Sequence, residues 1–403
     1  MIDVFRTGKW TSLIITALGL VLCLSTWFSA TSVAPTLVSN LSLNEADEIW
    51  LTSAVQAGFV FAALLSSFLS ISDAFNVSRV MSVAACFAAL SNLLLVVAID
   101  PWHAIAARFF TGCALAFVYP PALKYISTWF QKDRGIAMGL LVGALTVGSA
   151  LPHFINGLEA NENFASVIIY TSAAALMAGG IFWSLPKGPF SFGKANVDVR
   201  QIGAIIRNKP VMLANLGYFG HMWELYAMWG WIYAYSTSAI QTGLPLSNVS
   251  ILVFAVIAFG APGCVIAGLL SDKIGRCYTT SLMLTLSGFS ALMIGCFFTG
   301  PSWLFVMIAL IWGFSVVADS AQFSASVSEL SDQNFVGSAL TFQMAIGFLI
   351  TLFTIWLVPQ IATMFGSWRW SFIILSIGPF VGVFAMMKLR KMPDAKKMAN
   401  GRR

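Results

Sequence analysis

The sequence has few charged residues. Asp, Glu, Lys and Arg make up 9% of its 403 residues and apolar residues make up 58%, whereas a soluble domain is about a quarter charged. So small a share of charge could not cover the surface of a water-soluble fold of this length. The composition therefore excludes a soluble protein and indicates one that is embedded in lipid.

Three further features are missing. The six cysteines show no metal-ligand or paired redox spacing. The phosphate-binding pattern G-x-x-x-x-G-K-[ST] does not occur, which excludes ATP as an energy source. The apolar runs do not alternate with polar residues over about ten positions, as the strands of a membrane barrel do. We therefore expect an all-α integral membrane protein without a cofactor or metal.

Twelve apolar runs are long enough to cross a bilayer, whose core of about 30 Å takes roughly 20 helical residues. The first run is too long for a signal peptide and lacks a clear small-residue cleavage site, so we interpret it as a retained span. The predicted spans are Ser12–Val33, Ile49–Leu69, Val77–Ile99, Ala104–Phe130, Gly135–Ile155, Ala165–Leu185, Val211–Tyr235, Val249–Leu270, Thr279–Thr299, Trp303–Val327, Phe335–Met364 and Trp370–Met387.

The basic residues predict the orientation, because Lys and Arg concentrate in cytoplasmic loops. With the N-terminus inside, 19 of the 22 basic residues fall in cytoplasmic segments, and Arg369 falls on the opposite side. We expect a multi-pass protein of the cell (inner) membrane with both termini in the cytoplasm. This topology explains the net charge of +6 better than nucleic-acid binding does.

One polar segment separates six spans from six, an arrangement typical of transporters built from structural repeats. We expect an N-terminal six-helix bundle at 1–185, a cytoplasmic linker at 186–210, a C-terminal six-helix bundle at 211–387 and a basic cytoplasmic tail at 388–403. The turn after the second span of each half carries an acidic and a basic residue, Asp73 with Arg79 and Asp272 with Arg276.

The second of these turns reads GLLSDKIGR at 268–276. It resembles the loop signature G-x-x-x-D-[RK]-x-G-R of the major facilitator superfamily. Span 4 carries Arg108 and Gly112, similar to the R-x-x-x-G of that superfamily, and span 5 resembles its Gly-rich, Pro-ended helix. The resemblance covers essentially the whole chain and implies a twelve-helix alternating-access transporter with a central cavity between its halves.

Two other segments resemble bacterial members that are labelled nitrate/nitrite- or cyanate-porter-like. They are residues 129–135, with Trp129-Phe130 and Arg134-Gly135, and residues 149–153, which read SALPH. Nitrate porters place arginines in spans 2 and 8 and a Gly-Asn motif in span 5. In this sequence, spans 2 and 8 contain no Arg and span 5 contains no Asn.

Four charged residues fall well inside predicted spans: Arg108, Lys124, Glu224 and Asp319. Such a charge costs about 2.5–3.5 kcal/mol on insertion scales, so each is a functional hypothesis by default. His221 lies three residues before Glu224 on one helix face and can touch it. We predict that Glu224, Asp319 and His221 bind and release protons, with a structural Glu–His bond as the alternative.

The remaining predicted site residues fall into two groups. Substrate-binding candidates are Lys124, Arg108, Tyr119, Gln56, Gln322, Trp231 and Gln343. Lys124 would hold an anionic group if it points inward, although it could instead extend to the interface; Arg108 could be a structural anchor or the partner of a carboxylate. Gating candidates are Asp272, Lys273, Arg276, Asp73, Arg79 and Arg134, with Asp272 either capping a helix or pairing with Arg276.

These observations predict a monomeric secondary active transporter of a small solute, with protons favoured over sodium and a small anion as one substrate class. The alternative is a proton-antiport exporter of amphipathic compounds, because aromatic residues crowd span 7. A transporter-like membrane sensor is a second alternative. An enzyme is not expected, since it would need clustered His, Asp or Ser near an interface. The expected partners are the solute, protons and bilayer lipid.

Overall fold

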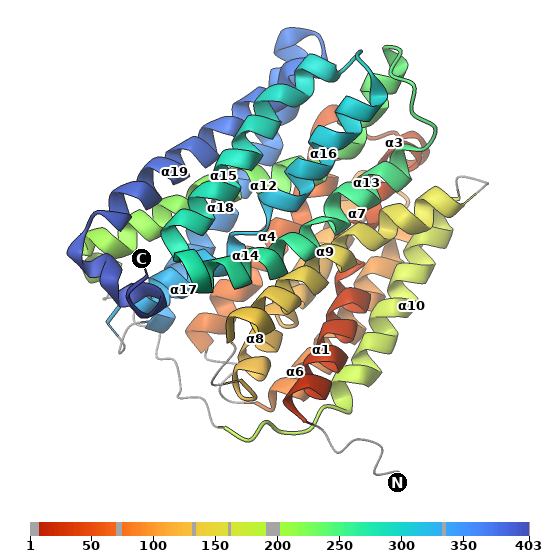
Figure 1. The fold of residues 1–403 in the computed structure, drawn as a ribbon. Coiled ribbons are helices and arrows are strands. Elements are labelled where there is room, and N and C mark those ends of the chain that lie inside the picture. Colours follow the sequence, from red (N-terminus) through yellow and green to blue (C-terminus); the bar gives the residue numbers. More distant parts are fainter. Residues whose placement is uncertain are drawn as a thin grey trace. The chain divides into compact units, whose positions relative to one another are not determined.

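The computed structural model describes residues 8–69, 75–130, 134–159, 163–190, 202–332 and 336–402 (Figure 1). Within these ranges the regular elements are all helices, as the sequence predicts. The chain divides into two compact units, unit 1 at residues 1–195 and unit 2 at residues 196–403. Among the described residues, ten helices are long and apolar enough to cross a membrane, five in each unit.

Unit 1 contains one helix for each predicted span or a short series of helices in its place. These are α1 (Lys9–Leu24), α2 (Ser29–Ser32), α3 (Ala34–Leu41), α4 (Glu45–Leu69), α6 (Val77–Leu93), η1 (Leu94–Val97), α7 (Pro101–Leu115), α8 (Tyr119–Ser127), α9 (Arg134–Leu158) and α10 (Phe164–Trp183). The helix α1 packs between α9 and α10, and α4 packs against α7.

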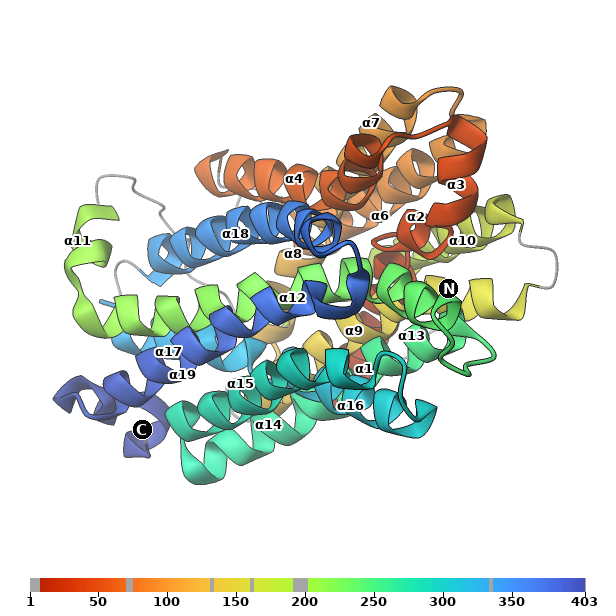
Figure 2. The same cartoon turned by 90° about the horizontal axis from the view of Figure 1, so that it is seen from above.

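Unit 2 is built in the same way. Its elements are α11 (Ile202–Arg207), α12 (Lys209–Gln241), α13 (Val249–Ala258), α14 (Gly260–Ile274), α15 (Arg276–Met293), η3 (Ile294–Phe297), α16 (Ser302–Val316), α17 (Ser320–Leu330), α18 (Val336–Phe365), η4 (Trp368–Ser376), α19 (Ile377–Arg390) and η5 (Pro393–Gly401). Figure 2 shows α12 and α19 side by side, and these two helices are in extensive contact.

Two of the twelve predicted spans have no counterpart among these ten apolar helices. The first predicted span is α1, of 16 residues, followed by the short helices α2 and α3. The seventh is α12, whose 33 residues are long enough to span the membrane, since a helix rises 1.5 Å per residue. Its Trp, Tyr, His and Glu residues make it less apolar than the other ten. The number of twelve spans therefore stays a prediction.

The fourth span of unit 1 and the corresponding span of unit 2 are both broken near the middle. In unit 1, α7 ends at Leu115 and α8 begins at Tyr119. The sequence predicts this break, because Pro120 has no N–H and its ring would clash with the carbonyl four residues earlier. In unit 2, α16 ends at Val316 and α17 begins at Ser320 without any proline there.

The same glycine contact supports both broken spans. A methyl group on Gly112 of α7 would clash with the carbonyl oxygen of Val55 on α4, and one on Gly313 of α16 would clash with that of Val256 on α13. Both residues of the second contact lie 201 positions after those of the first. Small residues allow this close backbone approach between membrane helices. The repeated contact supports a common architecture for the two units.

We expect Gly112→Ala to destabilise unit 1 by roughly 1–3 kcal/mol, the usual cost of overpacking a well-packed contact. Gly180→Ala on α10 is the matched control, because a methyl group there would meet nothing within 4 Å. That control should be neutral or stabilising by up to about 1 kcal/mol, since Ala favours helix more than Gly. Thermal unfolding of the two variants in detergent tests this difference, and equal melting temperatures would contradict it.

Candidate functional site

Four polar side chains form a buried cluster in unit 2, which we call the α12–α17 cluster. It consists of His221 and Glu224 on α12, Trp312 on α16 and Asp319 immediately before α17. Each is at most 1% exposed. Because polar groups are rare and costly inside apolar helices, such a cluster is a functional hypothesis by default.

The break in the tenth predicted span positions Asp319. The residue is the N-cap of α17, at a point where the helical hydrogen-bond ladder is interrupted. A helix N-terminus favours negative charge because its N–H groups point outward. The thiol of Cys264 on α14 donates to the carbonyl oxygen of Val317 at 3.6 Å, which satisfies one backbone group released by the break.

Two contacts connect the members of the cluster across helices. The Nδ1 atom of His221 lies 2.9 Å from Oδ1 of Asp319. The indole N–H of Trp312 donates to Oε1 of Glu224 at 2.6 Å. His221 is thus paired with Asp319 from the break between α16 and α17, whereas helical spacing predicts Glu224 as its neighbour.

Aromatic rings enclose the His221–Asp319 pair. The ring centroids of Tyr218 and Phe323 lie 5.9 and 5.7 Å from that of the His221 imidazole. Glu224 lies one helical turn further along α12 from His221. The cluster therefore holds three titratable groups out of contact with bulk water, where the proton occupancy of each group depends on that of its neighbours.

The contact between Trp312 and Glu224 is compatible with both protonation states of the carboxyl group. A carboxylate accepts hydrogen bonds through both oxygens, and a carboxylic acid keeps accepting capacity while it donates its own proton. The arrangement is suited to reversible proton binding.

Unit 1 contains a second buried polar group, centred on Arg108 of α7, which is fully buried. Its guanidinium donates to the carbonyl oxygen of Thr26 at 2.9 Å and to that of Trp27. It also donates to Oγ of Ser29 and Oδ1 of Asn92, each at 3.2 Å. Thr26 and Trp27 lie between α1 and α2, so Arg108 satisfies backbone carbonyls where the first predicted span is interrupted.

Asn92 on α6 extends this group to a further helix. Its amide nitrogen donates to the hydroxyl oxygens of Thr171 at 3.1 Å and Ser172 at 2.9 Å on α10. We call Arg108, Asn92 and their partners the Arg108 network. It connects α6, α7, α10 and the interrupted first span, which supports the structural-anchor interpretation of Arg108.

A third polar group lies at one end of unit 2. Arg276, the first residue of α15, forms an ion pair with Glu329 at 2.6 Å and donates to Oε1 of Gln322 at 2.6 Å. The N–H of Ala399 in η5 donates to the same Glu329 carboxylate at 3.1 Å. The signature arginine therefore joins α15, α17 and the C-terminal segment.

The structure thus gives Arg276 a partner other than the expected Asp272. Asp272 and Lys273 are exposed near the end of α14, so Asp272 is not at a helix N-terminus that it could cap. Arg79 is exposed at the start of α6. Asp73 and the side chain of Arg134 lie outside the described residues.

The predicted substrate-binding residues lie in different parts of the two units. In unit 1, Gln56 is buried on α4, while Tyr119 and Lys124 are partly buried on α8. In unit 2, Trp231 donates to the carbonyl oxygen of Ile355 at 2.8 Å, and Gln343 accepts a hydrogen bond from Ser324 at 3.2 Å. Gln322 is engaged with Arg276. Their role in substrate binding stays a prediction.

Sequence reasoning missed two members of these groups. Asn92 is a lone amide in an apolar run, and Trp312 is one of several aromatic residues in its span. The amide in a predicted span was a detectable signal for the first. No signal in the sequence distinguished the second. Within the described ranges, no group of three or more His, Cys, Asp or Glu side chains is placed to hold a metal ion.

Comparisons with known proteins agree with this architecture. The family model of the Major Facilitator Superfamily matches residues 15–318 and 242–403. The structure of the nucleoside transporter NupG superposes with a TM-score of 0.72 at 14% identity, covering 94% of this chain and 100% of that one. A bacterial homologue of the human lysosomal transporter Spinster, inward-facing and unoccupied, gives 0.69 at 14% identity, covering 96% and 100%.

Two curated relatives match about half of the chain. The MFS-type transporter pytF of Aspergillus terreus is 27% identical over 177 residues, 43% of this chain and 58% of that protein. The agnestins efflux protein of Paecilomyces divaricatus is 22% identical over 189 residues, 46% and 42% respectively. Both matches span less than two thirds of the relative's length. These relatives and structural neighbours are transporters and not enzymes. With a family model that matches most of its length and two units of the expected helical architecture, the chain belongs to the Major Facilitator Superfamily.

Proposed function

We propose that this protein is a proton-coupled secondary active transporter that moves a small solute across the cell (inner) membrane by alternating access. Twelve membrane-spanning helices in two six-helix halves, with both termini in the cytoplasm, carry this function, and the protein acts as a monomer. The observation that carries the proposal is the α12–α17 cluster, in which Glu224 and the His221–Asp319 pair are buried together.

The coupling step is a change of protonation in this cluster. Alternating access would expose the cluster to one side of the membrane and then to the other, and a proton would be bound on one side and released on the other. A ligand can shift such a conformational equilibrium only by its differential affinity for the two states. Because Asp319 lies at the break between α16 and α17, its charge state would act on the orientation of these two segments.

The substrate class has two candidates. The resemblance of residues 129–135 and 149–153 to nitrate/nitrite- or cyanate-porter-like proteins favours a small anion taken up with protons. A second function, proton-driven export of amphipathic compounds, is favoured by the buried aromatic residues of α12, among them Tyr226, Trp229 and Trp231. The agnestins efflux protein among the relatives supports this second function.

The direction of proton movement in proteoliposomes separates these functions. Purified protein is reconstituted with the pH indicator pyranine in the lumen, and nitrate, nitrite, cyanate or the lipophilic cation ethidium is added outside. Proton-coupled uptake of an anion should acidify the lumen, whereas exchange of the cation for protons should make it alkaline. Solute movement that occurs without any pH change, and that follows a sodium gradient instead, would contradict proton coupling.

A further inference from the structure

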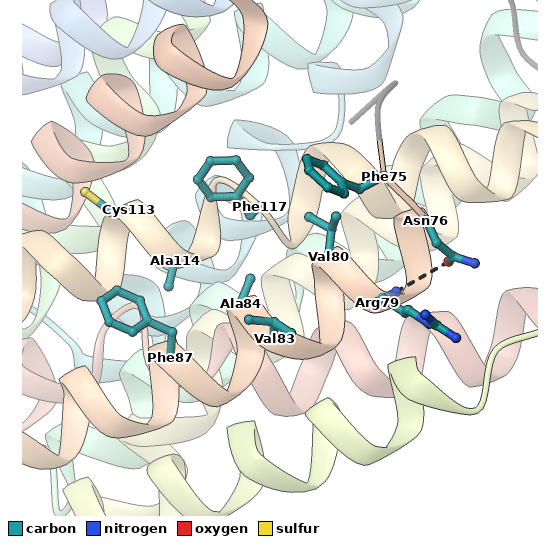
Figure 3. Close-up of a pocket in the computed structure, with 10 residues that line it drawn as sticks. All are labelled: Phe75, Asn76, Arg79, Val80, Val83, Ala84, Phe87, Cys113, Ala114 and Phe117. Carbon is teal, nitrogen blue, oxygen red and sulfur yellow. Dashed lines mark hydrogen bonds between the residues drawn. The ribbon is translucent and has the colours of Figure 1, made fainter. Parts of the chain in front are cut away.

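Unit 1 has an apolar groove of about 510 Å³ between α6 and α7 (Figure 3). Arg79 and Asn76 lie at one end of it, and Phe87 and Cys113 lie at the other. Phe117, in the break between α7 and α8, forms part of its wall. The volume falls within the range of about 300–1,000 Å³ that is typical of ligand sites.

The groove is open to the outer surface of unit 1. Phe75 and Val83 are each 66% exposed and Phe87 is 47% exposed. Val83 and Phe87 belong to Val77–Val97, a helical segment long and apolar enough to cross a membrane, so the solvent that meets them is the hydrocarbon of the bilayer. A ligand would therefore enter the groove from the lipid phase, and its part inside the groove would be apolar.

One end of the groove is positively charged. Arg79 is the one charged side chain among the described residues that line the groove. Its guanidinium lies over the ring of Trp183 at 5.3 Å. Asn76 caps the N-terminus of α6, because its side chain accepts hydrogen bonds from the backbone N–H groups of Ser78 and Arg79. Trp residues gather at the membrane–water interface, so Trp183 indicates that Arg79 lies at the level of the lipid headgroups.

The length of the groove matches one leaflet. It runs from the first turn of α6 to Phe87, ten residues after Val77, which corresponds to about 15 Å of helix. The hydrocarbon core of a bilayer is about 30 Å thick, so one leaflet contributes about half of that. An acyl chain that lies along the groove would thus end near the bilayer midplane while its headgroup remains beside Arg79.

We propose that this groove binds one anionic phospholipid. One of its acyl chains lies against Val80, Val83, Ala84 and Ala114, and its phosphate pairs with Arg79. The cation and the apolar wall are both required, because a zwitterionic lipid of the same acyl length has no net charge to complement Arg79. The site is separate from the α12–α17 cluster and does not depend on the transported solute.

Native mass spectrometry of the delipidated full chain tests this proposal by titration with phosphatidylglycerol and with phosphatidylcholine of identical acyl chains. We expect one phosphatidylglycerol to bind in preference to phosphatidylcholine. Arg79→Gln should weaken phosphatidylglycerol binding about fivefold, the contribution of one basic residue to binding an anionic lipid surface, and should leave phosphatidylcholine binding unchanged. Val83→Trp, which fills the groove, should remove the bound lipid.

Matched variants serve as controls. Lys209→Gln removes an exposed cation from the first turn of α12, another helix with an Asn N-cap. Val97→Trp adds the same ring at a position that is 68% exposed and outside the groove. Both should retain the wild-type lipid preference. Equal binding of the two lipids by the wild type, or a Lys209→Gln effect as large as that of Arg79→Gln, would overturn the proposal.

Discussion

Glu224→Gln is expected to abolish uphill accumulation of solute, by at least an order of magnitude, while solute exchange across the membrane continues. Gln is neutral and cannot release a proton, so the α12–α17 cluster would stay in a state that resembles the protonated one. The Gln carbonyl oxygen can still accept the hydrogen bond from Trp312, which in the wild type spans 2.6 Å. The fold around the site should therefore be preserved.

The measurement compares gradient-driven uptake with counterflow in proteoliposomes, using the solute that gives a proton signal with the wild type. Glu45→Gln is the matched control, since Glu45 is an exposed carboxylate in the first turn of α4. Asp319→Asn provides a second variant within the cluster and should show the same loss. Undiminished accumulation by both cluster variants would exclude the α12–α17 cluster as the proton-coupling site.

Arg108→Met is expected to destabilise the protein by roughly 3 kcal/mol. Each buried acceptor that loses its donor costs about 1–3 kcal/mol, and hydrogen bonds between membrane helices contribute on average near the lower end of that range. The substitution keeps an unbranched but shorter side chain and removes every donor. Two backbone carbonyls, a hydroxyl and an amide oxygen would lose the hydrogen bond from Arg108. The Thr26 carbonyl and Oδ1 of Asn92 would keep the hydrogen bond that each accepts from Ser29.

Thermal unfolding in detergent and the yield of folded protein after size-exclusion chromatography measure this effect. Arg207→Met, at an exposed position of α11, is the control for loss of one positive charge and should change neither. Arg108→Lys keeps the charge but not the fork of donors, so an intermediate loss of stability is expected. If Arg108→Met unfolds at the wild-type temperature and loses substrate affinity instead, Arg108 is a binding residue and not an anchor.

The helices could be predicted from the sequence because each depends on a local run of apolar residues. The break at Ala116–Val118 was also predictable, since Pro120 disturbs the helix through its own ring. The break before Ser320 has no such local cause. It is stabilised by contacts with other helices, including that from Cys264 to Val317, and contacts of this kind leave no periodic signal in the sequence.

The candidate site was predictable in its composition but not in its pairing. The rarity of charge in apolar runs identified Glu224 and Asp319, and helical spacing placed His221 near Glu224. Helical spacing reports neighbours on one helix only, so it could not show that His221 pairs with Asp319, immediately before α17, or that Glu224 meets Trp312. For the same reason the spacing within the loop signature suggested Asp272, and not Glu329, as the partner of Arg276.

The position of the Arg108 network in the chain has a consequence for biosynthesis. All four acceptors of Arg108 precede it in sequence, and the partners of Asn92 on α10 follow before unit 1 ends at residue 195. At about 5–20 residues per second, translation of unit 2 takes roughly 10–40 s more. The buried Arg108 of unit 1 thus acquires its hydrogen bonds before unit 2 has been translated. A chain with a defect in this network would therefore meet quality control while it is still being translated, before a complete transporter has formed.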